Sequence, residues 1–332
     1  MTEGPQTQRV DEVRARGARA VVAEFFRELL HLREQKWGNP WGYVCIAPAV
    51  ILYLVFEAWP IVRGILMSFS DYRWLVRSTH GLAGFNGLAN WTEMFADETF
   101  WRSLRISVQF SLMFMPIALV LSLFTAVMIS KVKNGIAASV YRVIAYMPVV
   151  LPLTVAMLVW AKLYDVKFGY LNVLLQNLGI QNPPNWLGSP KVALYAMVPP
   201  TIWVRFGEWV LLFLIGIYNI NREIYEAAVV DGANGLQQFG YITMPLLKPV
   251  FTLVLVLGSG IIGATVESMA LFGGTTGGPG QAALTTGVYV YRTAFINGDM
   301  RMGYAATMSL FVGIINMIIT GVVFVTMRTE RA

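Results

Sequence analysis

Charged residues, cysteine and histidine are all scarce in this chain of 332 residues. Charged residues make up 13% of the sequence, whereas a soluble globular domain has about 25%. The mean hydropathy of +0.57 points in the same direction. A single cysteine, Cys45, excludes an intrachain disulfide, and two histidines leave little for metal or general-base chemistry. This composition excludes disordered, collagen-like and disulfide-rich proteins, and it argues against a soluble enzyme.

The short motifs of common enzymes are missing as well. The sequence contains no G-x-x-x-x-G-K-[ST], no H-E-x-x-H and no G-x-S-x-G, so we expect no ATP site, no metal site and no catalytic residue in this chain. Gly258, Gly260 and Gly263 do form G-x-G-x-x-G, but inside an apolar run without a preceding strand. We therefore expect these glycines to let two helices pack closely.

Six long apolar runs dominate the rest of the sequence. Each supplies the roughly 20 apolar residues that a helix needs to cross about 30 Å of hydrocarbon. The runs are continuous rather than alternating, which indicates helices rather than barrel strands. The sequence therefore predicts an all-α integral membrane protein with six transmembrane helices, at Gly42–Phe69, Ser107–Ile129, Arg142–Leu163, Val192–Ile217, Pro249–Phe272 and Gly303–Met327.

Charge and periodicity set the N-terminal part of the chain apart. Residues 1–42 hold seven of the 25 Lys and Arg and six of the 19 Asp and Glu, so we expect a cytoplasmic tail there, a membrane domain at 43–327 and a short cytoplasmic end at 328–332. No cleaved signal peptide is expected, because about 40 residues of mixed charge precede the first apolar run. An amphipathic helix is predicted in the tail from apolar residues at helical spacing, namely Val22, Phe25, Phe26, Leu29 and Leu32.

The distribution of Lys and Arg favours one orientation in the membrane. With both termini in the cytoplasm, the inner segments hold 14 basic residues and the outer segments nine, although the excess comes from the tail. Basic cytoplasmic segments also account for the formal charge of +6, so we expect no nucleic-acid partner. We predict a multi-pass membrane protein with both termini in the cytoplasm.

The most informative pattern lies at residues 223–249, between the fourth and fifth runs. This segment, which we call the EAA segment, is too polar to span a membrane. Its first residues, Glu223–Val230, predict a short helix, and Asp231–Gly232 predicts a tight turn. A second helix is expected from about Asn234, and prolines mark the entry to the next span. Together these elements predict a rigid knob on the cytoplasmic face.

The EAA segment resembles the signature of the permease subunits of bacterial ABC importers: EAA, three residues, Gly, nine residues, then Ile-x-Leu-Pro. Here the pattern is Glu226-Ala227-Ala228, Gly232 and Ile242-Thr243-Met244-Pro245, in which only Met244 departs. The rest of the chain, from about residue 43 to 327, is similar to the MalF-like carbohydrate permeases. The similar stretches are WPIVRGILMSFSDY, FNGLANWTEMFAD, FGYLNVLLQNLGI, NWLGSPKVAL, and TGGPG followed by YVYRTAF.

The resemblance implies a noncatalytic transport subunit of the bacterial cytoplasmic membrane. Such a subunit imports a sugar or oligosaccharide that an extracytoplasmic solute-binding protein delivers. It also implies a second permease subunit, making a heterodimer, and two ABC ATPases that bind ATP and Mg, whereas this chain binds no cofactor. Contact with an ATPase would fall to the residues of the EAA pattern, which are Glu226, Ala227, Ala228, Asp231, Gly232, Ile242 and Pro245.

Polar and aromatic residues inside the apolar runs are candidates for the substrate path. A charge at the centre of a membrane helix costs about 2.5–3.5 kcal/mol on insertion scales, so it needs a reason. An equal alternative is that Arg205 and Glu208, three residues apart, simply pair with each other, and ordinary packing is the alternative for the aromatic residues. The candidates are Tyr146, Trp160, Trp203, Arg205, Glu208, Trp209, Ser259, Glu267, Ser268 and Asn316.

Other functions stay open at this point. The cargo of an ABC permease could instead be a glycerol phosphodiester, a polyol or a uronate-containing oligosaccharide, and additional cationic residues would favour an anionic cargo. This chain has Glu267-Ser268-Met269 where such permeases often have an aromatic-Asp pair, and Glu208 where they often have an uncharged residue, so the resemblance does not identify the cargo. A membrane channel or scaffold without an ATPase is a further alternative, against which the EAA spacing argues.

Overall fold

A computed structural model describes residues 40–80 and 84–327 of the chain. These residues form helices joined by turns, and within them the extended pairings are the isolated bridges Ser70–Phe85 and Arg73–Arg301. The predicted amphipathic helix of the tail and the predicted C-terminal end lie outside the described residues. The all-α fold that the sequence predicts is confirmed.

The chain divides into two compact units between Arg63 and Gly64. The first contains the predicted first span, built from α3 (Pro40–Tyr53), the π-helix η1 (Leu54–Ala58) and α4 (Trp59–Ser68), whose last turn belongs to the second unit. The helical stretch Gly42–Ser68 is long and apolar enough to cross a membrane, and none of its most apolar window is buried. Such a surface suits contact with hydrocarbon.

Three further helical stretches meet the same criteria of length and hydropathy. They are α6 (Glu98–Ser130), α10 (Ala193–Ala196) continuing into α11 (Val198–Tyr218), and α18 (Met302–Met327). Together with Gly42–Ser68, four spans of the predicted six are single helices. With 33 residues, α6 is about 50 Å long, so it extends beyond the hydrocarbon or tilts within it.

The predicted third span, Arg142–Leu163, is wrong as a single helix. Helix α7 (Gly135–Tyr146) continues through the 3₁₀ turn η4 (Met147–Val150), and α8 (Leu153–Leu163) then departs at 97°. Leu151, between the two, has extended backbone angles. Pro152 explains this break, because a proline lacks the N–H that a helix needs and disfavours helical angles in the residue before it.

The predicted fifth span, Pro249–Phe272, is also broken. Helix α15 (Lys248–Ser259) ends after 12 residues and is followed by the 3₁₀ turn η6 (Gly260–Gly263) and a separate short helix, α16 (Val266–Phe272). Each glycine destabilises a helix by about 1 kcal/mol relative to alanine. Gly260 and Gly263 therefore weaken the helix at the point where α15 ends. At its other end α15 meets the preceding helical stretch, Gly235–Leu246, at an angle of 63°, so these two form a second bent pair. The number of spans reaches six only if each bent pair counts as one.

The glycines of the G-x-G-x-x-G sequence behave differently from one another. A Cβ atom on Gly258 would collide with the Met115 side chain of α6, so this glycine does allow close packing of helices. A Cβ on Gly260 or Gly263 would meet no atom within 4 Å. The prediction of close helix packing is therefore right for Gly258 and wrong for the other two, which lie at the break after α15.

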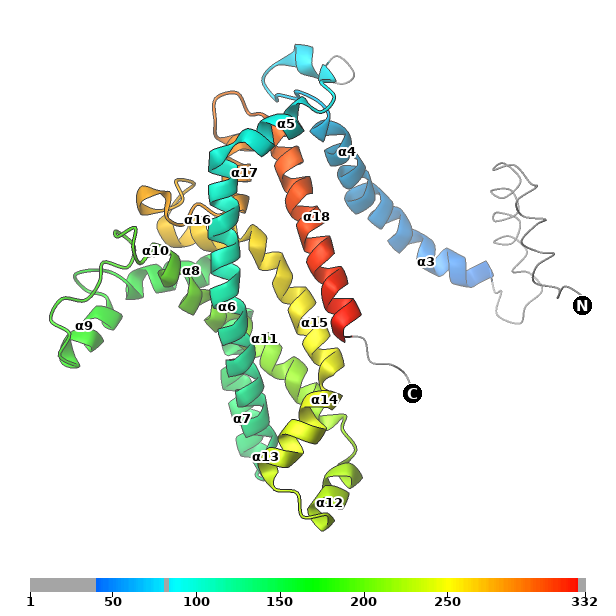
Figure 1. Ribbon diagram of the computed structural model, residues 1–332, viewed down its shortest axis with the longest axis vertical. Helices are drawn as coiled ribbons and strands as arrows, with labels where there is room; N and C mark the ends of the chain where they lie inside the picture. Colours follow the sequence, from blue (N-terminus) through cyan, green and yellow to red (C-terminus); the bar gives the residue numbers. More distant parts are fainter. Residues whose placement is uncertain (1–39, 81–83, 328–332) are drawn as a thin grey trace, which may run out of the picture. The chain divides into compact units, whose positions relative to one another are not determined.

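The core of the second unit is centred on α6 and α11, which pack side by side (Figure 1). The rings of Phe114 in α6 and Trp209 in α11 are buried and meet edge to face with 5.5 Å between centroids. One turn further along α11, Phe213 meets Phe251 of α15 in the same way at 5.0 Å. Aromatic contacts therefore hold these three helices together.

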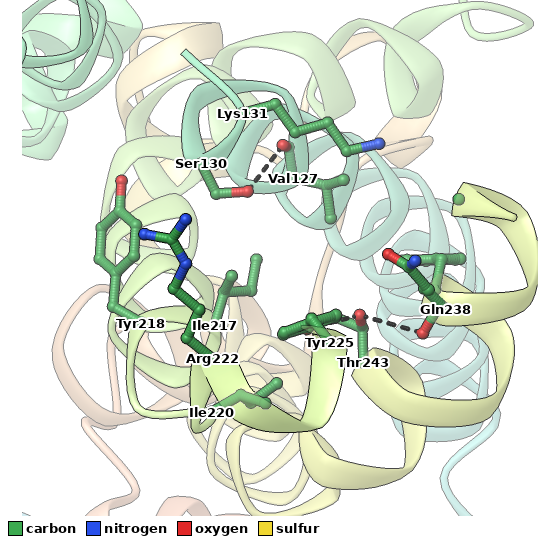
Figure 2. A pocket seen from close by; sticks show the side chains of 12 residues that line it. Val127, Ser130, Lys131, Ile217, Tyr218, Ile220, Arg222, Tyr225, Gln238 and Thr243 are labelled. Atoms are coloured by element: carbon green, nitrogen blue, oxygen red, sulfur yellow. Dashed lines mark hydrogen bonds between the residues drawn. The ribbon is translucent and has the colours of Figure 1, made fainter. Parts of the chain in front are cut away.

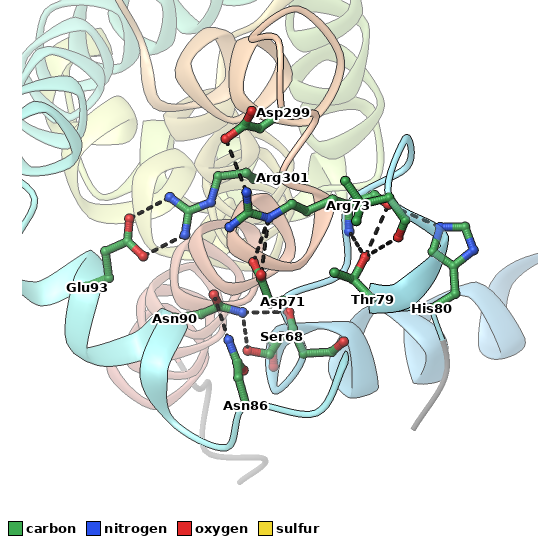
Figure 3. A network of polar contacts seen from close by, with 12 residues as sticks. Ser68, Asp71, Arg73, Thr79, His80, Asn86, Asn90, Glu93, Asp299 and Arg301 are labelled. Carbon is green, nitrogen blue, oxygen red and sulfur yellow. Dashed lines mark hydrogen bonds and ion pairs between the residues drawn. The ribbon is translucent and has the colours of Figure 1, made fainter. Parts of the chain in front are cut away.

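Polar contacts tie together distant segments at the end of this unit that carries α5 (Ala89–Ala96) (Figure 3). The Arg301 guanidinium donates to both carboxylate oxygens of Glu93, each at 2.6 Å. The Arg73 guanidinium bridges Asp71 at 3.1 Å and Asp299 at 3.2 Å. The paired hydrogen bonds of Arg301 fix orientation as well as distance and join α5 to the start of α18. The contact between Arg73 and Asp299 joins the loop after α4 to the loop before α18.

Asp97 joins three helices at the same end. Its Oδ1 accepts hydrogen bonds from the backbone N–H groups of Thr99 at 2.8 Å and Phe100 at 3.2 Å, which caps α6. Its Oδ2 accepts from the hydroxyls of Tyr289 in α17 (Thr286–Phe295) at 2.6 Å and Tyr304 in α18 at 2.7 Å. Burial acts to raise the pKa of Asp97, but these hydrogen bonds together bring that pKa below its ordinary value.

Candidate functional site

The first helix of the EAA segment is α12 (Arg222–Val230), within one residue of the prediction. It begins after Asn221, whose side chain accepts a hydrogen bond from the N–H of Glu223 at 3.1 Å. Arg222 and Glu226 form an ion pair of 3.0 Å one turn apart. Both side chains are exposed, so the pair stabilises the helix by only about 0.3–0.5 kcal/mol. Glu226 is therefore open to a partner.

The predicted turn at Asp231–Gly232 is present and ends α12. Gly232 has φ of +82°, and its N–H donates to the carbonyl of Val229 at 3.0 Å. The N–H of Ala233 donates to the carbonyl of Ala228 at 2.8 Å. These two bonds define a Schellman motif, in which one residue takes a left-handed backbone conformation. That conformation costs a residue with a side chain about 1–2 kcal/mol, a cost that glycine avoids. The glycine of the EAA pattern is thus required by the backbone of the turn.

The second half of the EAA segment begins where it was expected. Asn234 caps α13 (Gly235–Gln238) in a capping box: its side chain accepts from the N–H of Gln237 at 3.0 Å, and the Gln237 side chain accepts from the N–H of Asn234 at 2.8 Å. A π-helical turn that the sequence did not indicate, η5 (Phe239–Thr243), then leads through α14 (Met244–Leu246) to α15.

Most of the residues predicted to contact an ATPase are exposed. Glu226, Ala227, Asp231, Gly232 and Pro245 are exposed, and Ala228 and Ile242 are half-buried. Large apolar side chains are exposed on the same segment, which is unusual for residues meant to face water. They are Val229 at 61%, Val230 at 88%, Leu236 at 83% and Tyr241 at 82%. A segment with a fully hydrogen-bonded turn and exposed apolar side chains is suited to docking.

A second candidate site is a cavity of about 380 Å³ beside α11. It is lined by Arg205, Glu208 and Trp209 of α11 and by Glu267 of α16, among others. The 3₁₀ turn η6 and residues 264–265, where the predicted fifth span breaks, supply part of the wall. Irregular backbone at membrane depth is tolerated where it lines a watered cavity. The break in the predicted fifth span therefore forms part of the cavity wall.

The charged groups of this cavity are not paired with one another. The ion pairs found in the described ranges do not involve Arg205, Glu208 or Glu267. The alternative in which Arg205 and Glu208 simply pair is therefore not what the structure shows. Glu267 is only 4% exposed, and Glu208 is half-buried. The cavity thus holds two carboxylates and one guanidinium, which can hydrogen-bond to a polar solute.

The other candidates for the substrate path lie elsewhere. Trp160 and Trp203 pack against each other, with 6.2 Å between ring centroids. Ser259 donates to the carbonyl of Val256 at 2.8 Å, and the buried Ser268 donates to the carbonyl of Ala283 at 2.6 Å, so both hydroxyls serve the local backbone.

Two further candidates also stand apart from the cavity. Asn316 in α18 has a side-chain oxygen that is shielded from solvent and has no hydrogen-bond partner, and Tyr146 at the end of α7 is 39% exposed. Trp209 does reach the cavity, but only 2% of it is exposed, because its ring packs on Phe114. The structure therefore brings four of the ten candidates together, and it adds Thr265, which sequence reasoning missed. Gly260 and Gly263 could have indicated the break in the helix that brings Thr265 to the cavity.

Comparison with known proteins identifies the family. Residues 118–328 match the family described as binding-protein-dependent transport system inner membrane component. The probable ABC transporter permease protein PH1215 of Pyrococcus horikoshii is 34% identical over 280 residues, which cover 83% of this chain and 92% of that protein. The trehalose/maltose transport system permease protein MalF of Thermococcus litoralis is 31% identical over 277 residues, 82% of this chain and 88% of that one. The diacetylchitobiose uptake system permease protein NgcF of Streptomyces coelicolor is 30% identical over 288 residues, 83% and 79%.

Solved structures show the same fold. A bacterial ABC transporter involved in the import of the acidic polysaccharide alginate superposes with a TM-score of 0.72 over 94% of this chain and all of its own, at 20% identity. The sequence match, the exposed EAA segment and the membrane-spanning helices agree with one another. The chain is thus a permease subunit of an ABC importer, and it belongs to the family of binding-protein-dependent transport system inner membrane components.

Proposed function

We propose that this permease imports an uncharged saccharide or short oligosaccharide, handed over by an extracytoplasmic solute-binding protein. In this proposal it pairs with a second, different permease subunit and with two ATPases, which bind the ATP and Mg that this chain has no motif to bind. The observation that carries the proposal is the EAA segment, a hydrogen-bonded turn between two capped helices with exposed apolar side chains.

The EAA segment is suited to an ATPase groove because it is ordered before docking. The Schellman motif and the capping box fix its backbone, so little conformational entropy remains to be lost on binding. Its exposed apolar side chains, such as Val230 and Leu236, supply contact area. Lys131 and Arg222 line one cavity at this end of the molecule, and basic residues favour the cytoplasmic side. We accordingly place this end, and both termini, in the cytoplasm.

The cavity beside α11 supports an uncharged cargo. Its one cation, Arg205, stands with two carboxylates, Glu208 and Glu267. A site for a phosphodiester or uronate needs an excess of positive charge, because like charges in a partly dry cavity repel strongly. Carboxylates and guanidinium groups readily bond to sugar hydroxyls. The cargoes in the names of two relatives, trehalose/maltose and diacetylchitobiose, are uncharged, whereas that of the structurally similar alginate importer is acidic. The charge of the cavity therefore carries the choice of cargo class.

The test is ATP-driven uptake by the complete complex in proteoliposomes, with the Gly232→Pro variant. Proline requires φ near −65° and lacks an N–H, whereas Gly232 has φ of +82° and donates to Val229. We expect Gly232→Pro to reach the membrane in normal amounts but to lose uptake of a neutral oligosaccharide. Normal uptake by this variant would refute the coupling role of the segment. Faster uptake of a uronate oligosaccharide than of its neutral counterpart by the unmodified complex would refute the cargo class.

A further inference from the structure

Tyr225 is the residue immediately before Glu226, and it faces away from the exposed side of α12. It is half-buried, and its hydroxyl lies 2.8 Å from the hydroxyl of Thr243, which is 6% exposed. Thr243 is the last residue of the π turn η5, on the opposite limb of the EAA segment. Figure 2 shows the two side chains meeting beneath a cavity. This hydrogen bond joins the helix expected at the ATPase to the limb that leads into the membrane.

The donors and acceptors in this contact can be assigned. The Thr243 hydroxyl also lies 3.3 Å from the carbonyl oxygen of Gln238, which can only accept. Because a hydroxyl has one hydrogen, Thr243 donates to Gln238 and accepts from Tyr225. The Gln238 side chain in turn donates to the carbonyl of Ala233 at 3.1 Å. A chain of hydrogen bonds therefore runs from α12 through the π turn to the residue that follows Gly232.

Little else connects α12 to the membrane helices. None of its residues is buried. Behind it lies a cavity of about 510 Å³, bounded by the ends of α6 and α11 and by the π turn (Figure 2). On the other limb, Thr243 is followed directly by α14 and α15, and Phe251 of α15 packs on Phe213 in the core. A displacement of α12 can thus reach α15 across the hydroxyl pair as well as along the chain.

We propose that Tyr225 and Thr243 are positioning residues that transmit the movement of α12 to α15, so that ATP hydrolysis and substrate passage stay coupled. This inference rests on the proposed docking of α12 to an ATPase. The π turn is suited to such a role, because π turns inside helices often occur at functional sites. The hydroxyl pair ties α12 to the π turn η5, which leads through α14 to α15, while no residue of α12 is buried.

The experiment measures ATP hydrolysed per sugar imported, in proteoliposomes of the complete complex, for Tyr225→Phe and Thr243→Val. Both variants keep the shape of the side chain and remove a hydroxyl. We expect normal complex yield, ATP hydrolysis near the unmodified rate and uptake lowered roughly fivefold in Tyr225→Phe, the effect of losing one hydrogen bond, and by at least as much in Thr243→Val, which also loses the bond to Gln238. The double variant should be no worse than Thr243→Val alone, because that variant already lacks the contact with Tyr225.

Two matched controls separate this role from general damage. Thr243→Ser keeps the hydroxyl and should retain the unmodified ratio of ATP to sugar. Tyr141→Phe removes a hydroxyl from a tyrosine of α7 that is 51% exposed and lies outside the EAA segment, and it should also leave the ratio unchanged. A ratio that stays unmodified in both Tyr225→Phe and Thr243→Val would overturn the inference. Loss of the complex, or a proportional fall of hydrolysis and uptake, would also overturn it. If the unmodified complex shows no sugar-dependent ATP hydrolysis, the proposed function itself fails.

Discussion

Replacing Asp97 by alanine should loosen the end of the molecule where α6, α17 and α18 meet. The substitution removes the cap of α6 and leaves the hydroxyls of Tyr289 and Tyr304 without their shared acceptor. Loss of an N-cap costs about 1 kcal/mol, and a hydrogen bond to a charged group contributes about 1.5–3 kcal/mol. Asp97 is half-buried, so the low end of that range applies to both tyrosines. We expect a loss of about 4 kcal/mol for Asp97→Ala.

Asp97→Asn is the matched variant, because asparagine caps helices as well as aspartate does. It turns two charge-assisted hydrogen bonds into ordinary ones and should lose about 1–2 kcal/mol. The assay is thermal unfolding of the purified protein in detergent, followed by tryptophan fluorescence. Asp97→Ala should have the lowest melting temperature. Asp97→Asn and Tyr289→Phe should melt at temperatures between that of Asp97→Ala and that of the unmodified protein. An Asp97→Ala variant that melts within about 1 °C of the unmodified protein would refute this reasoning.

The pH dependence of that difference has a definite sign. Burial acts to raise the pKa of Asp97, but the hydrogen bonds to its charged form outweigh this effect and hold the pKa below the ordinary value of an aspartate. A lowered pKa in the folded state contributes stability that is present above the unfolded pKa and is lost as the pH falls through the folded value. The stability difference between the unmodified protein and Asp97→Asn should therefore be constant from pH 5 to pH 8, and it should shrink only in stronger acid.

Two further predictions concern the cargo path and the topology. Glu208→Gln keeps the shape of a side chain that lines the cavity with Arg205 and Glu267, so uptake should fall about tenfold or more while complex yield stays normal; unchanged uptake, or a lost complex, would show that Glu208 is only structural. Reporter fusions at Asn134 and Gln237 should lie in the cytoplasm, and fusions at Asn86, Asn185 and Gln281 outside. An external signal at Gln237 would place the EAA segment where no ATPase can reach it.

The features that the sequence predicted well are those that depend on near neighbours in the chain. Long apolar runs became membrane-length helices because a helix satisfies its own backbone wherever water is absent. In the EAA segment, α12, the turn at Gly232 and the start of the second helix at Asn234 were predicted to within about one residue, because helix caps and a left-handed turn are local interactions. The spacing of the EAA pattern also identified the family before any fold was known.

The breaks in the third and fifth spans were missed, although their residues were in view. A hydropathy pattern counts apolar residues and does not record the direction of the backbone. Pro152 therefore passed unnoticed in one run, and the glycines at 260 and 263 were interpreted as packing residues in the other. The π turn at Phe239–Thr243 has no hydropathy signal at all, since it differs from an α-helix only in its hydrogen-bond register.

Only the tertiary structure decided which candidates share a site. Arg205 and Glu208 lie on α11, whereas Glu267 reaches the same cavity because the chain breaks after α15 and turns into α16. The same packing left Trp160 and Trp203 against each other, away from the cavity. It also brought Tyr225 to Thr243, 18 residues later, and Asp97 to two distant tyrosines. Sequence spacing determines which residues share one helix face, but contacts between helices depend on how the whole set packs.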